Sequence, residues 1–142
     1  MNQVIFHLAI PIKDIDLAKN YYGDILGAKI GRENRHAVIF NFYGYQLVGH
    51  TTEEELTPPP NIYPRHFGLI FTDESQFDLF LSLCQEHHLE FYQPPKLRFK
   101  GQLTEHKTFF LQDPFYNILE FKFYSNYEAI FGATQLIAIG DR

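Results

Sequence analysis

The sequence predicts an α+β fold in which two β-α-β-β-β modules make up a single domain, residues 1–142. Its length of 142 residues is enough for one hydrophobic core but not for two independent ones. Its 15 Phe and 9 Tyr residues favour β-strands. The same order of strand-like and helix-like patterns occurs twice, once on each side of a proline-rich segment. These observations predict two related modules around a shared core.

The first module, residues 1–56, is predicted to begin with a strand, continue with a helix and end with a hairpin. Apolar side chains in residues 13–30 recur at helical spacing, with Asp14 placed to cap the helix and Gly27 to stop it. Gly44 separates the two arms of the hairpin. The predicted strands are residues 4–12, a segment near residues 28–33, residues 36–42 and residues 45–50.

The second module, residues 65–124, repeats this order. One and the same shift along the sequence places His7 on His66 and Asp14 on Asp73, so a strand histidine and a helix-capping acid recur together. The predicted elements are a strand at residues 66–71, a helix at 72–89, a strand at 90–100, and a hairpin of residues 107–112 and 117–123 across Asp113 and Pro114.

Two segments lie outside the modules. Residues 57–64 contain four prolines, which cannot continue a helix or a central strand, so we interpret them as a linker. The tail, residues 125–142, includes the apolar run "LIAI", which is expected to pack against its own chain or against a partner. The sequence therefore predicts a homodimer. The alternative is a C-terminal strand or frayed end with no role in association.

Composition and charge exclude several classes of protein. A net charge of -5 gives no basic surface for a nucleic-acid backbone. No apolar run approaches the roughly 20 residues of a membrane span, and the first residues lack a signal-peptide pattern. The one cysteine, Cys84, cannot form an internal disulfide and falls on the apolar face of the second helix. We expect a cytoplasmic protein that binds neither nucleic acid nor membranes.

A few polar residues stand in apolar strand patterns. A single histidine there is more often a hydrogen-bonded core or surface residue than a ligand. The matched pair His7 and His66, together with the isolated acid Glu120, favours a metal site, because a buried carboxylate needs a partner such as a cation. The alternative for Glu120 is an edge-strand acid that faces solvent or pairs with Lys122. Superposing the two hairpins, with one extra residue in the Asp-Pro turn, puts His50 opposite Glu120.

These motifs resemble a known family. The paired modules with "FHLAIP", "RHFGL" and "DPFYNILEF" resemble the vicinal-oxygen-chelate superfamily, over roughly residues 4–124. This superfamily includes glyoxalase I, fosfomycin-resistance and bleomycin-resistance proteins, and type I extradiol dioxygenases. The longer stretches "FNFYGYQLVGH", "RHFGLIF", "LRFKG" and "DPFYNILEFK" resemble small single-domain proteins grouped as predicted dioxygenases of the extradiol family.

The resemblance implies a curved, partly open mixed β-barrel around a divalent metal. Its ligands would be the strand-one histidine of each module and the last-strand glutamate of the second, here His7, His66 and Glu120. Two imidazoles and one carboxylate on one face of an ion leave three positions open, as in non-haem Fe(II) oxygenases. Fe(II) is the expected metal, with Mn, Zn or Ni as alternatives. The usual Asp-Pro-x-Gly-Asn turn reads residues 113–117 here, with Tyr116 in the place of glycine.

Two further groups are candidates for binding substrate. "KLRFKG" alternates Lys96, Arg98 and Lys100 with apolar residues, which places three cations on one strand face. They would form either a clamp for a substrate carboxylate or phosphate, with Arg98 as its fork, or a solvated edge that resists aggregation. His106 lies in the polar stretch "GQLTEHK", which is either a lid over the substrate or a loop.

The function expected from the resemblance and the three ligands is a metal-dependent dioxygenase. It would use O2 to open the ring of a small catecholic or similar vicinal-dioxygen substrate. His50 is the candidate acid–base residue, since a histidine can move a proton near neutral pH; a fourth ligand and a surface histidine are the alternatives. A glyoxalase- or fosfomycin-type lyase or transferase would instead use the metal as a Lewis acid. A metal-free module of the bleomycin-resistance type would not need the three ligands.

Overall fold

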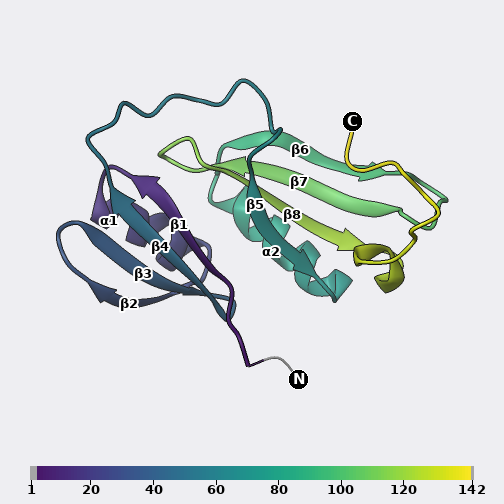
Figure 1. The fold of residues 1–142 in the computed structure, drawn as a ribbon, viewed down its shortest axis with the longest axis horizontal. Helices are drawn as coiled ribbons and strands as arrows, with labels where there is room; N and C mark the ends of the chain where they lie inside the picture. Colours follow the sequence, from purple (N-terminus) through teal and green to yellow (C-terminus); the bar gives the residue numbers. More distant parts are fainter. Residues whose placement is uncertain (1–2, 142) are drawn as a thin grey trace.

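The structure, a computed structural model, describes residues 3–141 and contains two four-stranded sheets (Figure 1). The strand order is β1-β4-β3-β2 in the first sheet and β5-β8-β7-β6 in the second. β1 pairs with β4 in parallel, and so does β5 with β8. All other neighbouring strands are antiparallel. The predicted α+β class and module order are confirmed, and the sheets are not closed. The strands are β1 (His7–Ile12), β2 (Lys29–Glu33), β3 (Ala37–Phe42), β4 (Tyr45–Thr51), β5 (Phe67–Phe71), β6 (Phe91–Arg98), β7 (His106–Gln112) and β8 (Ile118–Tyr124).

The helix of the first module is shorter and less regular than its sequence predicts. The α-helix α1 (Ile15–Ala18) passes directly into a π-helical segment, η1 (Lys19–Ile25). The Asp14 carboxylate accepts a hydrogen bond from the backbone N–H of Leu17 at 2.8 Å, as expected for an N-cap. Gly27, with φ at +88°, ends the segment in a left-handed conformation that favours glycine.

The helix of the second module, α2 (Glu74–Glu86), agrees more closely with its pattern. Asp73 caps it by accepting the backbone N–H of Ser75 at 3.0 Å. Its buried face carries Phe77, Phe80 and Cys84. The predicted core position of Cys84 is therefore confirmed, and burial raises the pKa of its thiol to about 12.

β6 ends earlier than its alternating pattern predicts. The strand stops at Arg98, because Phe99 takes a left-handed φ of 54° and begins a turn that includes Gly101. Lys96 and Arg98 lie on the strand, but Lys100 lies exposed in the turn. The prediction of three cations on one strand face is therefore wrong for Lys100.

The turn between β7 and β8 fastens the second module to the first. The Asp113 carboxylate accepts hydrogen bonds from the backbone N–H groups of Phe115 and Asn117, each at 2.8 Å. It also accepts the buried hydroxyl of Tyr22 from η1 at 2.6 Å. The Asn117 amide donates to the Pro11 carbonyl of β1 at 3.0 Å. One hydrophobic cluster of buried residues joins the two modules; it includes Ile12, Tyr22, Phe40, Phe80, Phe109 and Phe121.

In this turn, the position that is glycine in the usual Asp-Pro-x-Gly-Asn motif is occupied by Tyr116, and its backbone is left-handed. Tyr116 adopts φ at 68°. A side chain in this conformation carries a steric cost that glycine avoids. The hydrogen bonds to Asp113 hold the turn closed around it.

Replacing Tyr22 with Phe is expected to lower the free energy of unfolding by about 1.5–3 kcal/mol, the usual range for a hydrogen bond to a charged group. The substitution removes the hydroxyl that Asp113 accepts across the module boundary and adds no atoms. Urea denaturation followed by circular dichroism measures the change. Tyr45→Phe is the control, because this side chain is 48% exposed, and its effect should stay within about 0.5 kcal/mol. Equal stability of the two variants would contradict the prediction.

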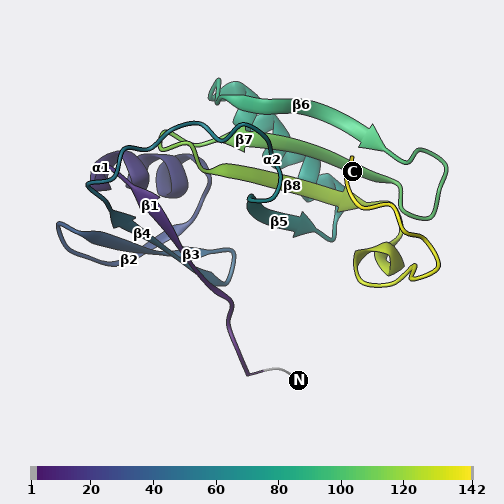
Figure 2. The ribbon, with the colours of Figure 1, turned by 45° about the horizontal axis from the view of Figure 1, so that its top comes forward.

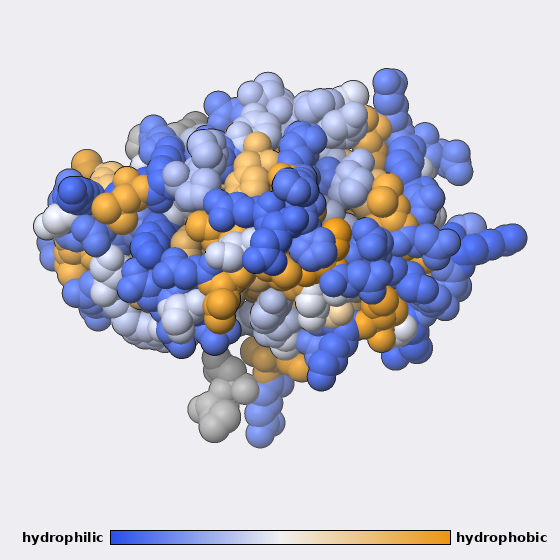
Figure 3. Space-filling model, turned by 180° about the vertical axis from the view of Figure 1, so that it is seen from behind, coloured by the Kyte–Doolittle hydropathy of each residue, from blue (hydrophilic) through white to orange (hydrophobic). Residues whose placement is uncertain are grey.

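Both ends of the described chain expose apolar side chains. The segment before β1 projects from the body of the molecule (Figure 2), and Val4 and Ile5 are 80% and 72% exposed. In the tail, Phe131 and Ile137 are 90% and 94% exposed. On the back of the molecule, by contrast, hydrophilic side chains surround small apolar groups (Figure 3). No helix within residues 3–141 is long and apolar enough to cross a membrane.

Candidate metal centre

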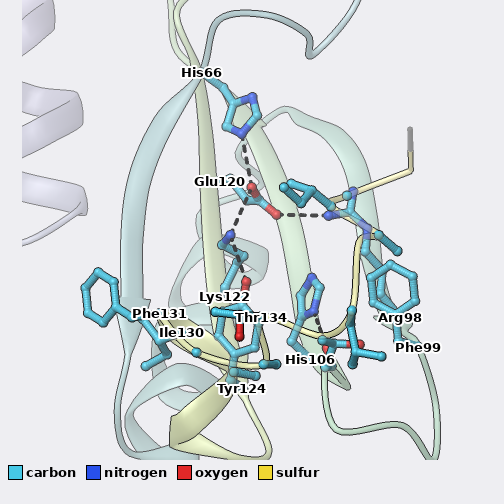
Figure 4. Close-up of a pocket in the computed structure, with 18 of the residues that line it drawn as sticks. His66, Arg98, Phe99, His106, Glu120, Lys122, Tyr124, Ile130, Phe131 and Thr134 are labelled. Carbon is cyan, nitrogen blue, oxygen red and sulfur yellow. Dashed lines mark hydrogen bonds and ion pairs between the residues drawn. The ribbon is translucent and has the colours of Figure 1, made fainter.

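Glu120 is a buried carboxylate with four polar neighbours. It lies on β8, between β5 and β7, and is 5% exposed. Thr108 and Arg98 both donate to its Oε2 atom, at 2.6 and 3.3 Å. His66 Nε2 lies 3.1 Å from its Oε1 atom, and Lys122 Nζ lies 3.9 Å from the same oxygen (Figure 4). Burial alone would raise the pKa of Glu120, but the hydrogen bonds from His66 and Thr108 and the neighbouring cations lower it below its ordinary value.

The orientation of the His66 ring is fixed by its other nitrogen. Nδ1 lies 2.7 Å from the carbonyl oxygen of Ile62, and because a carbonyl can only accept, Nδ1 carries the proton of this hydrogen bond. Nε2 faces Glu120 Oε1, and it either carries a second proton, which it donates to the carboxylate, or has a lone pair that can bind a metal ion. The hydrogen bond to Glu120, opposed by burial, raises the pKa of His66.

The spacing of these two atoms fits a metal ion. Neighbouring ligand atoms that each lie about 2.1 Å from a metal are separated by about 3 Å. His66 Nε2 and Glu120 Oε1 are 3.1 Å apart. The backbone carbonyl of Ile62 behind His66, and Thr108 behind Glu120, are the kind of outer hydrogen bonds that orient metal ligands. The two residues therefore fit two of the three protein ligands of the predicted metal centre.

Arg98 connects this pair to the surface. Its guanidinium stands over the Phe110 ring at 5.7 Å, and the side chain is 6% exposed. Nη1 donates to Glu120, and Nη2 donates to Asp141 in the tail at 2.9 Å. Its Nε–H group is buried and has no hydrogen-bond partner within the described residues.

His106, the first residue of β7, contributes a free imidazole nitrogen. Its Nδ1 donates to the carbonyl of Thr104 at 2.9 Å, so its buried Nε2 is an acceptor, and no partner for Nε2 exists among residues 3–141. Burial lowers the pKa of His106 and so favours the neutral ring. Figure 4 shows the ring between Arg98 and Lys122.

These side chains line one cavity of about 430 Å³. Its floor is the sheet face that carries His66, Arg98, His106 and Glu120, and its opposite wall is the tail. Arg98 and His106, which line the cavity, each have a buried nitrogen without a partner in the described chain, and His66 and Glu120 face each other there. Such a set can bind a small polar molecule and exchange a proton with it.

The predicted ligand His7 lies elsewhere. It is the first residue of β1 in the other sheet, is exposed, and its Nδ1 contacts the Gln46 amide oxygen at 2.8 Å. β1 and β5 point in opposite directions in Figure 1, so the starts of the two strands are apart. Within residues 3–141, no three His, Cys, Asp or Glu residues are grouped to hold a metal ion. One chain thus brings together His66 and Glu120 but not His7.

His50 and Lys100 are also outside the cavity. His50 is exposed on β4 and pairs with Pro11, four residues beyond His7, whereas Glu120 pairs with Gly68, two residues beyond His66. The two registers differ, so His50 is not the counterpart of Glu120, and the superposition that predicted this is wrong. Lys100 lies in the turn after β6 and does not line the cavity.

Three residues of this site were not among the site residues predicted from the sequence. Thr108 could have been found, because it is two positions after His106 on a strand and therefore faces the same side. Lys122 was noted only as an alternative partner of Glu120, from which it is likewise two residues away. Asp141 gave no signal, since nothing in the pattern of the tail relates it to Arg98.

The matching family model is the "Glyoxalase/Bleomycin resistance protein/Dioxygenase superfamily", over residues 4–121. The chain belongs to this superfamily. The implied vicinal-oxygen-chelate family is thereby confirmed, and this superfamily includes metal-dependent enzymes with different reactions as well as binding proteins. No curated protein sequence matches the chain.

Solved structures agree with the superfamily fold. A glyoxalase/bleomycin resistance protein/dioxygenase from Alicyclobacillus acidocaldarius is 39% identical, with a TM-score of 0.85, over 91% of this chain and 97% of that one. The fosfomycin resistance protein FosX from Listeria monocytogenes is 15% identical, with a TM-score of 0.70, over 91% and 99%. Lactoylglutathione lyase from Agrobacterium tumefaciens is 18% identical, with a TM-score of 0.66, over 86% and 94%. At these lower identities the last two show the fold alone.

Proposed function

We propose that this superfamily protein is a divalent-metal-dependent enzyme that binds a small substrate through two neighbouring oxygens. The observation that carries the proposal is the 3.1 Å approach of His66 Nε2 and Glu120 Oε1 in a cavity. Both atoms are held in place from behind, by Ile62 and by Thr108. When the His66 ring is neutral, its Nε2 atom and the Glu120 carboxylate can bind the same metal ion.

The third ligand in this proposal is His7 of a second copy of the chain. His7 begins β1, an edge strand whose outer side pairs with no other strand among the described residues. The apolar residues Val4 and Ile5 just before it are largely exposed, as are Phe131 and Ile137 in the tail. Open strand edges and exposed apolar segments are surfaces that a second chain can cover. A homodimer would therefore complete the metal centre and bury these side chains.

The proposed reaction is extradiol ring opening of a catechol-type substrate. When bound, Fe(II) held by two imidazoles and a carboxylate has free positions for two substrate oxygens and for O2. His106 lines the cavity, and its Nε2 acceptor, which has no partner in the described chain, would take the proton of a substrate hydroxyl. His106 thus replaces His50 as the candidate acid–base residue. Arg98, packed on Phe110, would hold negative charge on the substrate.

A lyase or transferase reaction is the second candidate. The features that favour it are the proton acceptor of His106 and the cations Arg98 and Lys122, which suit Lewis-acid chemistry without O2. Loading the protein anaerobically with Fe(II) and measuring oxygen uptake with catechol and 3,4-dihydroxybenzoate separates the two. Uptake that requires Fe(II) supports the dioxygenase. Metal binding without oxygen uptake, together with turnover of an electrophilic substrate under Zn, Ni or Mn, would replace it with the second candidate.

Mixing two inactive variants tests the shared metal centre. In a symmetric dimer, His7→Ala and Glu120→Ala each lose metal, but after exchange half of the dimers are mixed and one of their two sites is intact, so about a quarter of the wild-type metal content should return. Anaerobic refolding of the mixture followed by metal analysis and gel filtration measures this.

The matched control is a mixture of His66→Ala with Glu120→Ala. His66 and Glu120 of one site come from the same chain. Every site in this mixture therefore lacks one of these two ligands, and no metal should return. Equal metal content in the two mixtures would contradict a metal centre shared by two chains. A wild-type protein that binds no divalent metal in either assay would contradict the proposed function itself.

A further inference from the structure

Most of the cavity wall that lies outside the matched superfamily region, which ends at residue 121, belongs to the tail. After β8 the chain forms a short 3₁₀-helix, η2 (Tyr127–Ile130), and then returns across the sheet toward β6 (Figures 1 and 2). Its contribution to the lining is Ala129, Ile130, Phe131, Gly132, Ala133, Thr134, Leu136, Ala138, Ile139 and Gly140. The tail therefore decides how the cavity is closed on this side.

Asp141 anchors the tail to two cations of β6. Its Oδ2 atom accepts from Lys96 Nζ at 2.8 Å and from Arg98 Nη2 at 2.9 Å. Its backbone N–H donates to the Tyr63 hydroxyl at 2.7 Å. Lys96 and Arg98 are two residues apart on the strand, so their side chains stand on the same face. Together they form a seat for one carboxylate, which we call the β6 anion seat.

The β6 anion seat is built for an anion but holds Asp141 only loosely. Arg98 is 6% exposed, whereas the Asp141 side chain is 43% exposed. Water competes with the β6 anion seat for the partly exposed Asp141 carboxylate, so this ion pair is weaker than one in which both partners are buried. Arg98 lines the cavity, whereas Lys96 and Asp141 do not, so an anion that takes the place of Asp141 would bind at the edge of the cavity.

A second observation indicates that the cavity awaits a polar ligand. The Nε–H donor of Arg98 and the Nε2 acceptor of His106 are both buried without a partner in the described chain. Unpaired buried donors and acceptors are costly and are found where a ligand or water completes them. A ligand with a carboxylate for Arg98 and a hydroxyl for His106 would satisfy both.

We propose that the β6 anion seat of Lys96 and Arg98 binds the carboxylate of a hydroxylated aromatic acid, and that Asp141 occupies this seat as a latch until the substrate displaces it. The inference deepens the proposed function, on which it rests for the catechol part of the substrate. It adds that the substrate carries a carboxylate and that the tail opens when this group binds. Asp141 thus lowers the apparent affinity by the fraction of molecules in which it holds the seat.

Asp141→Asn tests the latch. The probes are 3,4-dihydroxybenzoate and catechol, which differ only by the carboxylate, and their dissociation constants are measured by anaerobic calorimetry in metal-free and metal-loaded protein. Asp141→Asn should bind 3,4-dihydroxybenzoate about three- to tenfold more tightly than wild type, since a weak internal competitor is removed. Its affinity for catechol should not change. Asp78→Asn, which alters the net charge equally at an exposed residue paired with Lys107, should behave as wild type.

A second substitution tests the seat without removing the buried guanidinium. Lys96 is 39% exposed and bonds to Asp141, so Lys96→Met should leave the fold intact. In the Asp141→Asn background it should abolish most of the preference for 3,4-dihydroxybenzoate over catechol. Equal affinities of wild type and Asp141→Asn for 3,4-dihydroxybenzoate would overturn the latch, and an unchanged preference in Lys96→Met would overturn the seat. The effect of Asp141→Asn is expected in metal-free protein too. A failure to bind metal would therefore contradict the proposed function without changing the expected ratio of the dissociation constants of wild type and Asp141→Asn for 3,4-dihydroxybenzoate.

Discussion

Glu120→Gln is expected to lower the affinity for divalent metal by roughly 100-fold or more, a larger loss than outer-shell substitutions cause. Glutamine keeps the size of the side chain and its contact with Thr108, but it removes the negative charge that faces His66 Nε2. A metal ion at this position would then lose one anionic ligand. Calorimetric titration with Mn(II), and metal analysis of protein prepared with Fe(II), measure the effect.

Glu90→Gln is the matched control. This exposed acid accepts a hydrogen bond from Gln112 on β7 at 2.8 Å and is outside the cavity. Its substitution should leave metal affinity unchanged. Circular dichroism must show that Glu120→Gln is folded, since Arg98 then depends on Asp141 for its remaining countercharge. Wild-type metal affinity in folded Glu120→Gln protein would mean that the His66–Glu120 contact is a simple imidazolium–carboxylate pair.

Gly68→Ala is expected to have the largest effect on the fold. Gly68 pairs with Glu120 in the β5–β8 register, and a methyl group at Gly68 would lie 1.6 Å from the Glu120 carbonyl oxygen. This obstacle is backbone, so it cannot rotate away. β5 would have to separate from β8, and we expect a loss of about 3 kcal/mol or more in the free energy of unfolding, at the upper end for overpacked sites.

Urea denaturation measures this loss, and metal titration of the variant measures its effect on the site. Because the clash is at Glu120 itself, metal affinity should fall together with stability. Gly31→Ala is the control: it lies in the edge strand β2, and its new methyl group would meet the Ile39 carbonyl oxygen at 3.4 Å, an ordinary contact. If both substitutions cost the same, the close approach of β5 and β8 does not limit the fold.

The local features of the fold could be predicted because their causes are local. Asp14 and Asp73 cap their helices through contacts within three residues, and the sequence shows both. His66 and Glu120 could be placed together in advance because the resemblance to the vicinal-oxygen-chelate superfamily implied that both are ligands of one metal. The buried face of α2 followed from its apolar spacing.

The rest of the site depends on information that the sequence pattern does not carry. His50 was misplaced because strand register changes by whole residues without any change in alternation. Lys100 was misplaced because a single left-handed residue, Phe99, ends β6. The position of His7 depends on how the modules pack together, and that of Asp141 on the path of the tail. These are long-range features, which a single sequence leaves open.

The contacts of the turn between β7 and β8 have a consequence for protein engineering. Asp113 and Asn117 tie this turn to Tyr22 and Pro11 of the first module, and Glu120 follows Asn117 by three residues on the same chain. A chimera that takes one module from a homologue therefore needs a matched hydroxyl and carbonyl at the junction. Without them, β8 would enter the graft at a different angle, and the Glu120 carboxylate, although chemically intact, would be misplaced relative to the other ligands.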